Sequence, residues 1–134
     1  MKTFILIAIF GMTAVAHGWV SPRKQAGNIA DLVGDWRGTS LCQVRPSACS
    51  DERVVYHFSN PQAGKITVSA DKIVDAKVVN MGSSVWTYDE SARLLSWEMP
   101  RGVWKLTVNG DSMDGTLTGA DNTVFRKVHL QKSK

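Results

Sequence analysis

The stretch "LVGDWRGTSLC", residues 32–42, places a glycine, one further residue and a tryptophan at the start of a segment with strand character. Gly34 has access to backbone conformations closed to other residues, so it allows a tight turn into the strand. Side chains alternate across a strand, so Trp36 shares one face with Gly38 and Ser40. We expect this face to line the interior of an all-β domain.

The residues before this strand predict a short helical turn. The segment "NIADLV", residues 28–33, offers Asn28 as a cap and apolar residues at helical spacing. Residues 17–28 are polar, carry Pro22 and Gly27, and show neither the period of a strand nor that of a helix. We interpret them as a flexible N-terminal arm, and we expect the domain itself to span residues 29–134.

The first sixteen residues have the three parts of a secretory signal peptide. Lys2 is followed by an apolar run, which ends in the small-residue triplet Ala14-Val15-Ala16. The run is shorter than the roughly 20 apolar residues that a helix needs to cross a membrane. We therefore expect cleavage after Ala16 and a secreted or periplasmic protein that does not span a membrane.

Short segments of alternating apolar and polar residues, separated by turn residues, fill the rest of the chain. Asn109-Gly110 is one such turn, and it is a strong hairpin signal because both residues tolerate positive φ. We interpret residues 74–84 as a loop or an irregular edge. The predicted strands are 34–44, 53–59, 65–73, 84–89, 93–99, 102–110, 111–119 and 123–132.

These segments predict an eight-stranded antiparallel up-and-down β-barrel. Amphipathic helices of the length that links parallel strands do not occur between them, which excludes βαβ units. An open antiparallel sheet of this size would leave two exposed edges, and closure into a barrel removes them. A two-sheet sandwich is the structural alternative, but uniformly short hairpins favour the simple meander.

The two cysteines, Cys42 and Cys49, are separated by the six residues "QVRPSA". In an exported protein this spacing suits a disulfide across the loop of a hairpin. A zinc site is the alternative, but the sequence has no second cysteine pair to complete four ligands. The net charge of +4 is spread along the chain, so we expect no nucleic-acid binding.

Arg126 lies on the predicted inward face of the last strand, with Val124, Val128 and Leu130. An inward guanidinium needs partners, and we expect it to stack on the indole of Trp36 and to donate to carbonyls of the helical turn.

Together with the turn at 28–33 and the Gly34-x-Trp36 motif, Arg126 makes the chain resemble the calycin superfamily, which includes lipocalins, from about residue 28 to the end. The resemblance implies that Trp36 and Arg126 pack together to close one end of the barrel. Lipocalins carry a central Thr-Asp-Tyr motif, whereas here the order is Thr87-Tyr88-Asp89. The resemblance therefore assigns no particular calycin family.

A barrel of eight strands either packs solid or encloses one small ligand. We expect a monomer that binds a small, largely apolar molecule without covalent chemistry. The sequence shows no nucleophile elbow, no HExxH and no phosphate loop, so we expect neither an enzyme nor a cofactor or metal. The candidate ligand-binding residues are the large inward side chains Trp86, Tyr88, Trp97, Trp104 and Met113.

Two alternatives involve the N-terminal arm. An exported barrel with a Gly-x-Trp motif and one disulfide resembles bacterial periplasmic inhibitors of secreted metalloproteases, in which an N-terminal segment enters the protease cleft. Residues 17–28 would be that segment, and the partner would be a secreted protease or another protein. The residues "HGWV" from His17 also resemble the start of secreted copper monooxygenases, in which a terminal amine and imidazole bind copper.

Overall fold

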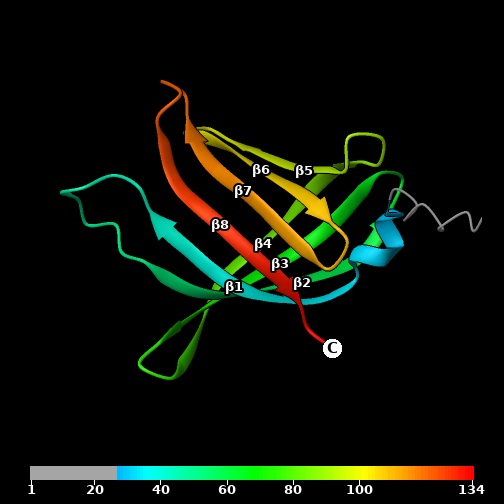
Figure 1. The fold of residues 1–134 in the computed structure, drawn as a ribbon, viewed down its shortest axis with the longest axis horizontal. Coiled ribbons are helices and arrows are strands. Elements are labelled where there is room, and N and C mark those ends of the chain that lie inside the picture. The colour runs from blue at the N-terminus through cyan, green and yellow to red at the C-terminus, as the bar shows by residue number, and fades with distance from the viewer. Residues whose placement is uncertain (1–26) are drawn as a thin grey trace, which may run out of the picture.

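The computed structural model describes residues 27–134, which form one closed barrel of eight antiparallel strands in consecutive order (Figure 1). This confirms the predicted all-β up-and-down barrel. The predicted signal peptide and residues 17–26 of the predicted arm lie outside the described residues. The elements are η1 (Ile29–Leu32), β1 (Gly34–Cys42), β2 (Glu52–Gln62), β3 (Lys65–Val74), β4 (Lys77–Asp89), β5 (Leu94–Met99), β6 (Gly102–Asn109), β7 (Ser112–Gly119) and β8 (Val124–Lys132).

A capping box starts η1, the predicted helical turn. The side chain of Asn28 accepts a hydrogen bond from the N–H of Ala30, and the carboxylate of Asp31 accepts one from the N–H of Asn28. These bonds satisfy backbone donors that the start of a helix leaves unpaired. Gly34 follows with a φ of 124°, a backbone conformation that residues with a Cβ rarely adopt, and it directs the chain into β1.

Trp36 is the centre of the barrel end that η1 covers. Its side chain has no exposed surface, and its Nε1 donates to the carbonyl of Leu32 at 2.8 Å. The indole meets the ring of Phe58 edge to face, with centroids 6.1 Å apart. Buried side chains from most of the strands complete this closed end; among them are Ile66, Leu95, Leu106, Val108, Met113 and Leu130.

Lys132, not Arg126, provides the cation over Trp36. The Nζ of Lys132 lies 5.7 Å from the centre of the indole and donates to the carbonyl of Asp31 in η1. The register of β1 and β8 explains the difference, because it pairs Trp36 with Lys132 and Cys42 with Arg126. Six residues of strand correspond to about 20 Å. Arg126 does face inward, but its expected stacking on Trp36 is wrong.

Except for the turn at Asp75 and Ala76, residues 74–84 belong to β3 and β4, so the loop interpretation of this segment is wrong, whereas the alternative of an irregular edge agrees with the structure. Val74 ends β3 and pairs with Lys77 at the start of β4. Asp75 and Ala76 form the two-residue turn between them with φ of 49° and 61°, and two such residues match the twist of a hairpin. The irregularity that does exist is a register shift opposite Gly82, which has φ of 102°.

Replacing Trp36 with alanine is expected to lower the free energy of unfolding by about 3–5 kcal/mol, because it leaves a large cavity and unpairs the Leu32 carbonyl. Urea unfolding followed by circular dichroism measures the loss. Val78→Ala is the control, since Val78 is 68% exposed and its truncation should change stability little. A loss below about 1 kcal/mol for Trp36→Ala would contradict the closing role.

Candidate functional site

An aromatic cavity of about 300 Å³ lies in the half of the barrel away from η1. Its walls come from β2 to β6 and are mainly apolar, with two serines and a glycine in β4. Its lining residues are Tyr56, Val68, Ala70, Met81, Gly82, Ser83, Ser84, Trp86, Trp97, Met99 and Trp104. Apolar walls with a few polar groups are typical of small-molecule sites.

Trp86 lies at the centre of the group of aromatic rings that lines this cavity. Its ring stacks on Trp97 with centroids 5.9 Å apart, and it lies 6.2 Å from Trp104 and 6.5 Å from Tyr56. Its Nε1 donates to the hydroxyl of Ser84 at 2.9 Å, which fixes the indole. Trp86 is 3% exposed, whereas Trp97 and Trp104 keep part of their surface free. Trp97 and Trp104 therefore expose aromatic surface to the cavity, and the buried Trp86 supports them from behind.

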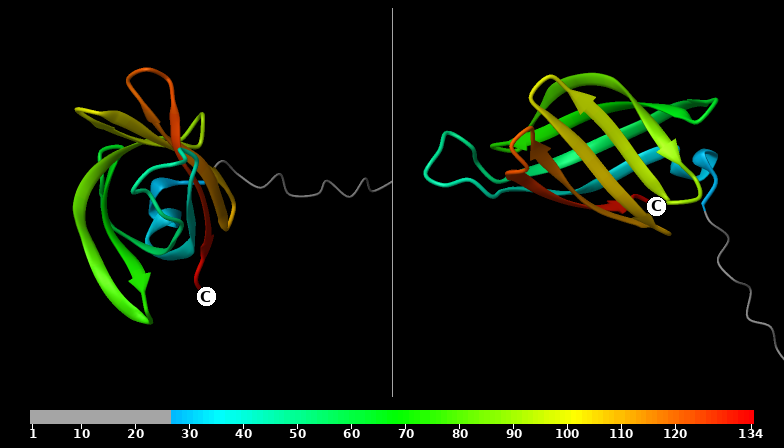
Figure 2. Two further views of the ribbon diagram at one scale, coloured as in Figure 1. Left: turned by 90° about the vertical axis from the view of Figure 1, so that its left-hand side faces the viewer. Right: turned by 90° about the horizontal axis from the view of Figure 1, so that it is seen from above.

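The cavity exists because β5 separates from β4. The two strands pair only through residues 87–89 of β4 and 94–96 of β5. Beyond Ser96, the residues of β5 pair with β6 alone, and residues 77–86 of β4 pair with β3 alone. Figure 2 (left) shows the tips of the β3–β4 and β5–β6 hairpins far apart. The barrel is thus closed by three residue pairs, with an opening beside them.

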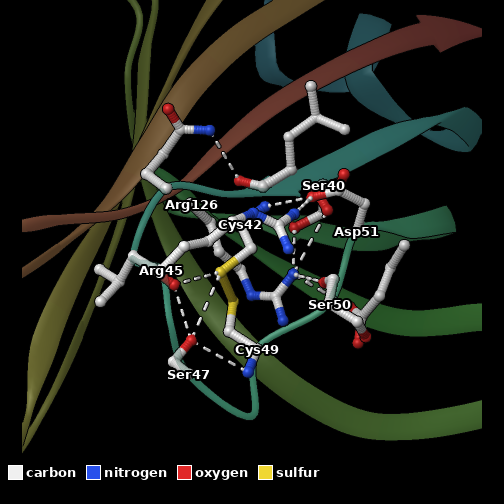
Figure 3. The surroundings of a disulfide bond; sticks show 12 residues. Ser40, Cys42, Arg45, Ser47, Cys49, Ser50, Asp51 and Arg126 are labelled. Atoms are coloured by element: carbon white, nitrogen blue, oxygen red, sulfur yellow. Dashed lines mark hydrogen bonds and ion pairs between the residues drawn. A yellow bond between two sulfur atoms is a disulfide. The ribbon is translucent and has the colours of Figure 1, made fainter.

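Arg126 organises the polar groups at this end of the barrel (Figure 3). Its Nη1 donates to the carbonyl and hydroxyl of Ser40 at 3.3 and 3.2 Å and to the carbonyl of Ser50 at 3.2 Å. The same nitrogen lies 3.4 Å from a carboxylate oxygen of Glu52. Burial raises the pKa of the nearby Tyr56 phenol to about 12, although the charge of Arg126 opposes the shift. Tyr56 is therefore a neutral part of the cavity wall at physiological pH.

The predicted disulfide between Cys42 and Cys49 is confirmed, with Cα atoms 5.9 Å apart. It closes the loop between β1 and β2 (Figure 3). Asp51 holds the loop to the barrel, because its carboxylate accepts from the N–H of Cys42 and from Arg45 at 2.8 and 2.9 Å. A disulfide of this kind is typical of an oxidising, extracytoplasmic location.

The structure divides the five predicted ligand-binding residues between two places. Trp86, Trp97 and Trp104 line the aromatic cavity. Tyr88 and Met113 instead lie in the closed end, where they are 4% and 0% exposed. The hydroxyl of Tyr88 donates to the carbonyl of Gly27 at 2.9 Å. Alternation along a strand gives the direction of a side chain but not its height along the barrel axis, which the register sets.

Sequence reasoning missed Tyr56, Met81, Ser83 and Ser84. Tyr56 lies in a run of β2 that is apolar on both faces, so the alternation assigned it no direction. Met81 and Ser83 lie in the segment interpreted as a loop or an irregular edge, and Ser84 lies where that segment meets the predicted strand 84–89. The residues 77–84, "KVVNMGSS", contain two valines but also Asn80 and Gly82, which mask the strand signal.

His57 forms a polar brace on the outer surface. Its Nδ1 lies 2.7 Å from Asp35 and its Nε2 2.8 Å from Asp71, so the ring joins β1, β2 and β3. Hydrogen bonds that the ring donates to Asp35 and, next in size, to Asp71 raise the pKa of His57. The bond to His57 and a second from Asn80 lower the pKa of Asp71. Both ring nitrogens are engaged, so we assign this cluster a structural role.

The described part of the chain contains no group of three or more histidine, cysteine, aspartate or glutamate side chains placed to hold a metal ion. Within the same residues, 27–134, no helix has the length and apolar character needed to cross a membrane.

Fold and site together define a class of protein: a small, closed, eight-stranded antiparallel β-barrel with one disulfide and an aromatic cavity in its wall. No family model matches the chain, and no curated protein matches it significantly by sequence.

The His57 brace predicts a pH-dependent stability. A raised pKa means that the contribution of His57 is complete below its ordinary value of 6.5 and is lost as the pH rises through the folded-state pKa. The lowered pKa of Asp71 gives a contribution that is complete above its ordinary 3.8 and is lost as the pH falls through the folded-state value. The brace therefore stabilises the fold fully between about pH 3.8 and pH 6.5, the ordinary pKa values of the two side chains.

The variant His57→Gln should lose about 1 kcal/mol or less near pH 5.5, because the brace is partly exposed, and less still near pH 9. Urea unfolding at both pH values gives the difference. Asp35→Asn removes the largest cause of the shift and should reduce the same pH dependence. A difference between wild type and His57→Gln that stays constant with pH would contradict the brace.

Proposed function

We propose that this protein is an exported, calycin-like barrel that binds a small, largely apolar molecule in the aromatic cavity. The observation that carries the proposal is a hollow of about 300 Å³ in which three tryptophans meet beside an opening in the barrel wall. This volume lies at the lower end of the roughly 300–1,000 Å³ typical of ligand pockets. It therefore favours a compact ligand of up to three rings.

The walls favour a neutral ligand. Tyr56 is uncharged because its pKa is about 12, and Arg126 already has partners in Ser40, Ser50 and Glu52. A charged ligand would lose its hydration without gaining an unpaired counter-charge. The serine hydroxyls of β4 can accept or donate one or two hydrogen bonds, and flat rings can stack on the free surfaces of Trp97 and Trp104.

Two further observations support the wider proposal. Cys42 and Cys49 form a disulfide, which fits the export that the first sixteen residues predict. An antiparallel barrel of eight strands preceded by a short turn fits the calycin resemblance, in which the interior holds a ligand. We propose binding rather than catalysis, because the charged groups at this end of the barrel, Arg126 and Glu52, are engaged with each other and with Ser40 and Ser50.

The test uses the exported, disulfide-bonded protein and the neutral fluorescent probe N-phenyl-1-naphthylamine. We expect saturable binding, seen as enhanced probe emission and quenched tryptophan emission. Trp97→Ala should weaken binding about fivefold, because it removes one stacking wall worth roughly 1 kcal/mol.

Phe125→Ala is the matched control, since it removes an aromatic ring that is 38% exposed and is not part of the cavity wall. Circular dichroism establishes that both variants fold. Absence of saturable binding to the wild type, or equal binding by Trp97→Ala, would overturn the proposal. Native mass spectrometry of the exported protein can then identify a ligand that co-purifies.

A further inference from the structure

The separation of β5 from β4 leaves a strand edge without a partner. β4 spans Lys77–Asp89, and β5 pairs with only the last three of these residues. Among the described residues, no other strand pairs with this edge between residues 77 and 86. An unpaired edge presents a row of backbone N–H and C=O groups that can pair with another strand.

The hydrogen-bonding direction identifies the groups on this edge. The N–H of Tyr88 donates to Gly64, on the β3 side of β4. Successive residues direct their backbone groups to opposite edges, so Trp86 and Ser84 also direct theirs to β3. Ser83 and Val85 therefore direct their N–H and C=O groups to the free edge.

Apolar side chains accompany the free edge. Eight large apolar side chains are exposed among the described residues, and four of them lie on β4. Val78 is 68% exposed, Val85 56%, and Val79 and Met81 41% each. Val74, 44% exposed, lies at the other side of the same hairpin. A concentration of exposed apolar side chains on one strand favours an interaction surface over ordinary solvated surface.

The charge pattern indicates the partner. Edge strands are commonly protected from pairing by charged residues or proline, but residues 78–88 contain neither. An uncharged strand segment is complementary to a second uncharged segment, and residues 78–88 of β4 are such a segment. Antiparallel pairing of two copies would place no like charges opposite each other.

We propose that β4 is the interface of a symmetric dimer, in which the free edges of two copies pair antiparallel about a two-fold axis near Ser84. Ser83 of one copy then lies opposite Val85 of the other, and the same pair repeats across the axis, as in any isologous interface. The register shift at Gly82 ends the ladder on one side, and the pairing of residues 87–89 with β5 ends it on the other. The dimer goes beyond ligand binding and differs from the monomer expected from the sequence.

The test measures the mass of the disulfide-bonded protein by sedimentation velocity from about 10 µM to about 500 µM, a range that covers weak association. We expect a concentration-dependent dimer, with hydrogen exchange at the amides of Ser83 and Val85 slower in the dimer. Val85→Lys should weaken the dimer at least tenfold, because it places two positive charges next to the axis. Leu41→Lys is the matched control, since Leu41 is 41% exposed on β1, which has a strand on each side.

A wild type that stays monomeric over the whole range overturns the proposal. A dimer that Val85→Lys does not weaken, or that Leu41→Lys weakens equally, also overturns it, since the interface then lies elsewhere. Circular dichroism establishes that both variants fold. Binding of N-phenyl-1-naphthylamine by the wild-type protein is measured separately, so failure of the dimer and failure of ligand binding are distinguished.

Discussion

The pairing of β4 with β5 over three residues is the constraint on which the rest of the structure depends. These pairs, between residues 87–89 and 94–96, close the barrel at the η1 end. Because the strands part beyond them, the interior opens sideways and exposes Trp97 and Trp104. A full ladder between β4 and β5 would cover both the aromatic cavity and the free edge of β4. The two proposals therefore share one structural cause.

The barrel has one densely packed end and one end that contains a cavity. At the η1 end, Trp36, Leu32 and Tyr88 connect the turn to the strands through packing and through hydrogen bonds to backbone carbonyls. At the other end, aromatic rings remain partly free and the polar groups pair among themselves. A rigid closed end allows the open end to keep unfilled volume, because the free energy lost there is offset by dense packing elsewhere.

Local sequence patterns were sufficient for the barrel but not for the position of its opening. Alternation predicted the strands and the inward direction of Trp86, Trp97 and Trp104, since this direction depends on neighbours in sequence. The end of the β4–β5 ladder depends on contacts between hairpins, which no local pattern records. Tyr88 was assigned to the cavity for the same reason, because its height in the barrel follows from register.

The exchange of roles between Arg126 and Lys132 shows what a short motif does and does not determine. Burying Trp36 under a helical turn creates a site for a cation, because the indole face and the carbonyl of Asp31 both attract positive charge. Any long basic side chain of β8 at the right register satisfies that site, and Lys132 is the residue opposite Trp36. Arg126 is thereby available at the other end, where its Nη1 donates to the carbonyls of Ser40 and Ser50.

Arg126 also connects the disulfide loop to the barrel interior. Its Nη1 contacts Ser50, the neighbour of Cys49, and Ser40, which is 2% exposed inside β1. The loop between β1 and β2 is thus fixed at three points: the disulfide, Asp51 and Arg126. A loop held in this way cannot fold into the barrel and fill it with its own side chains. The disulfide and the inward arginine therefore keep the end of the barrel away from η1 in one defined shape, which a pre-formed binding cavity requires.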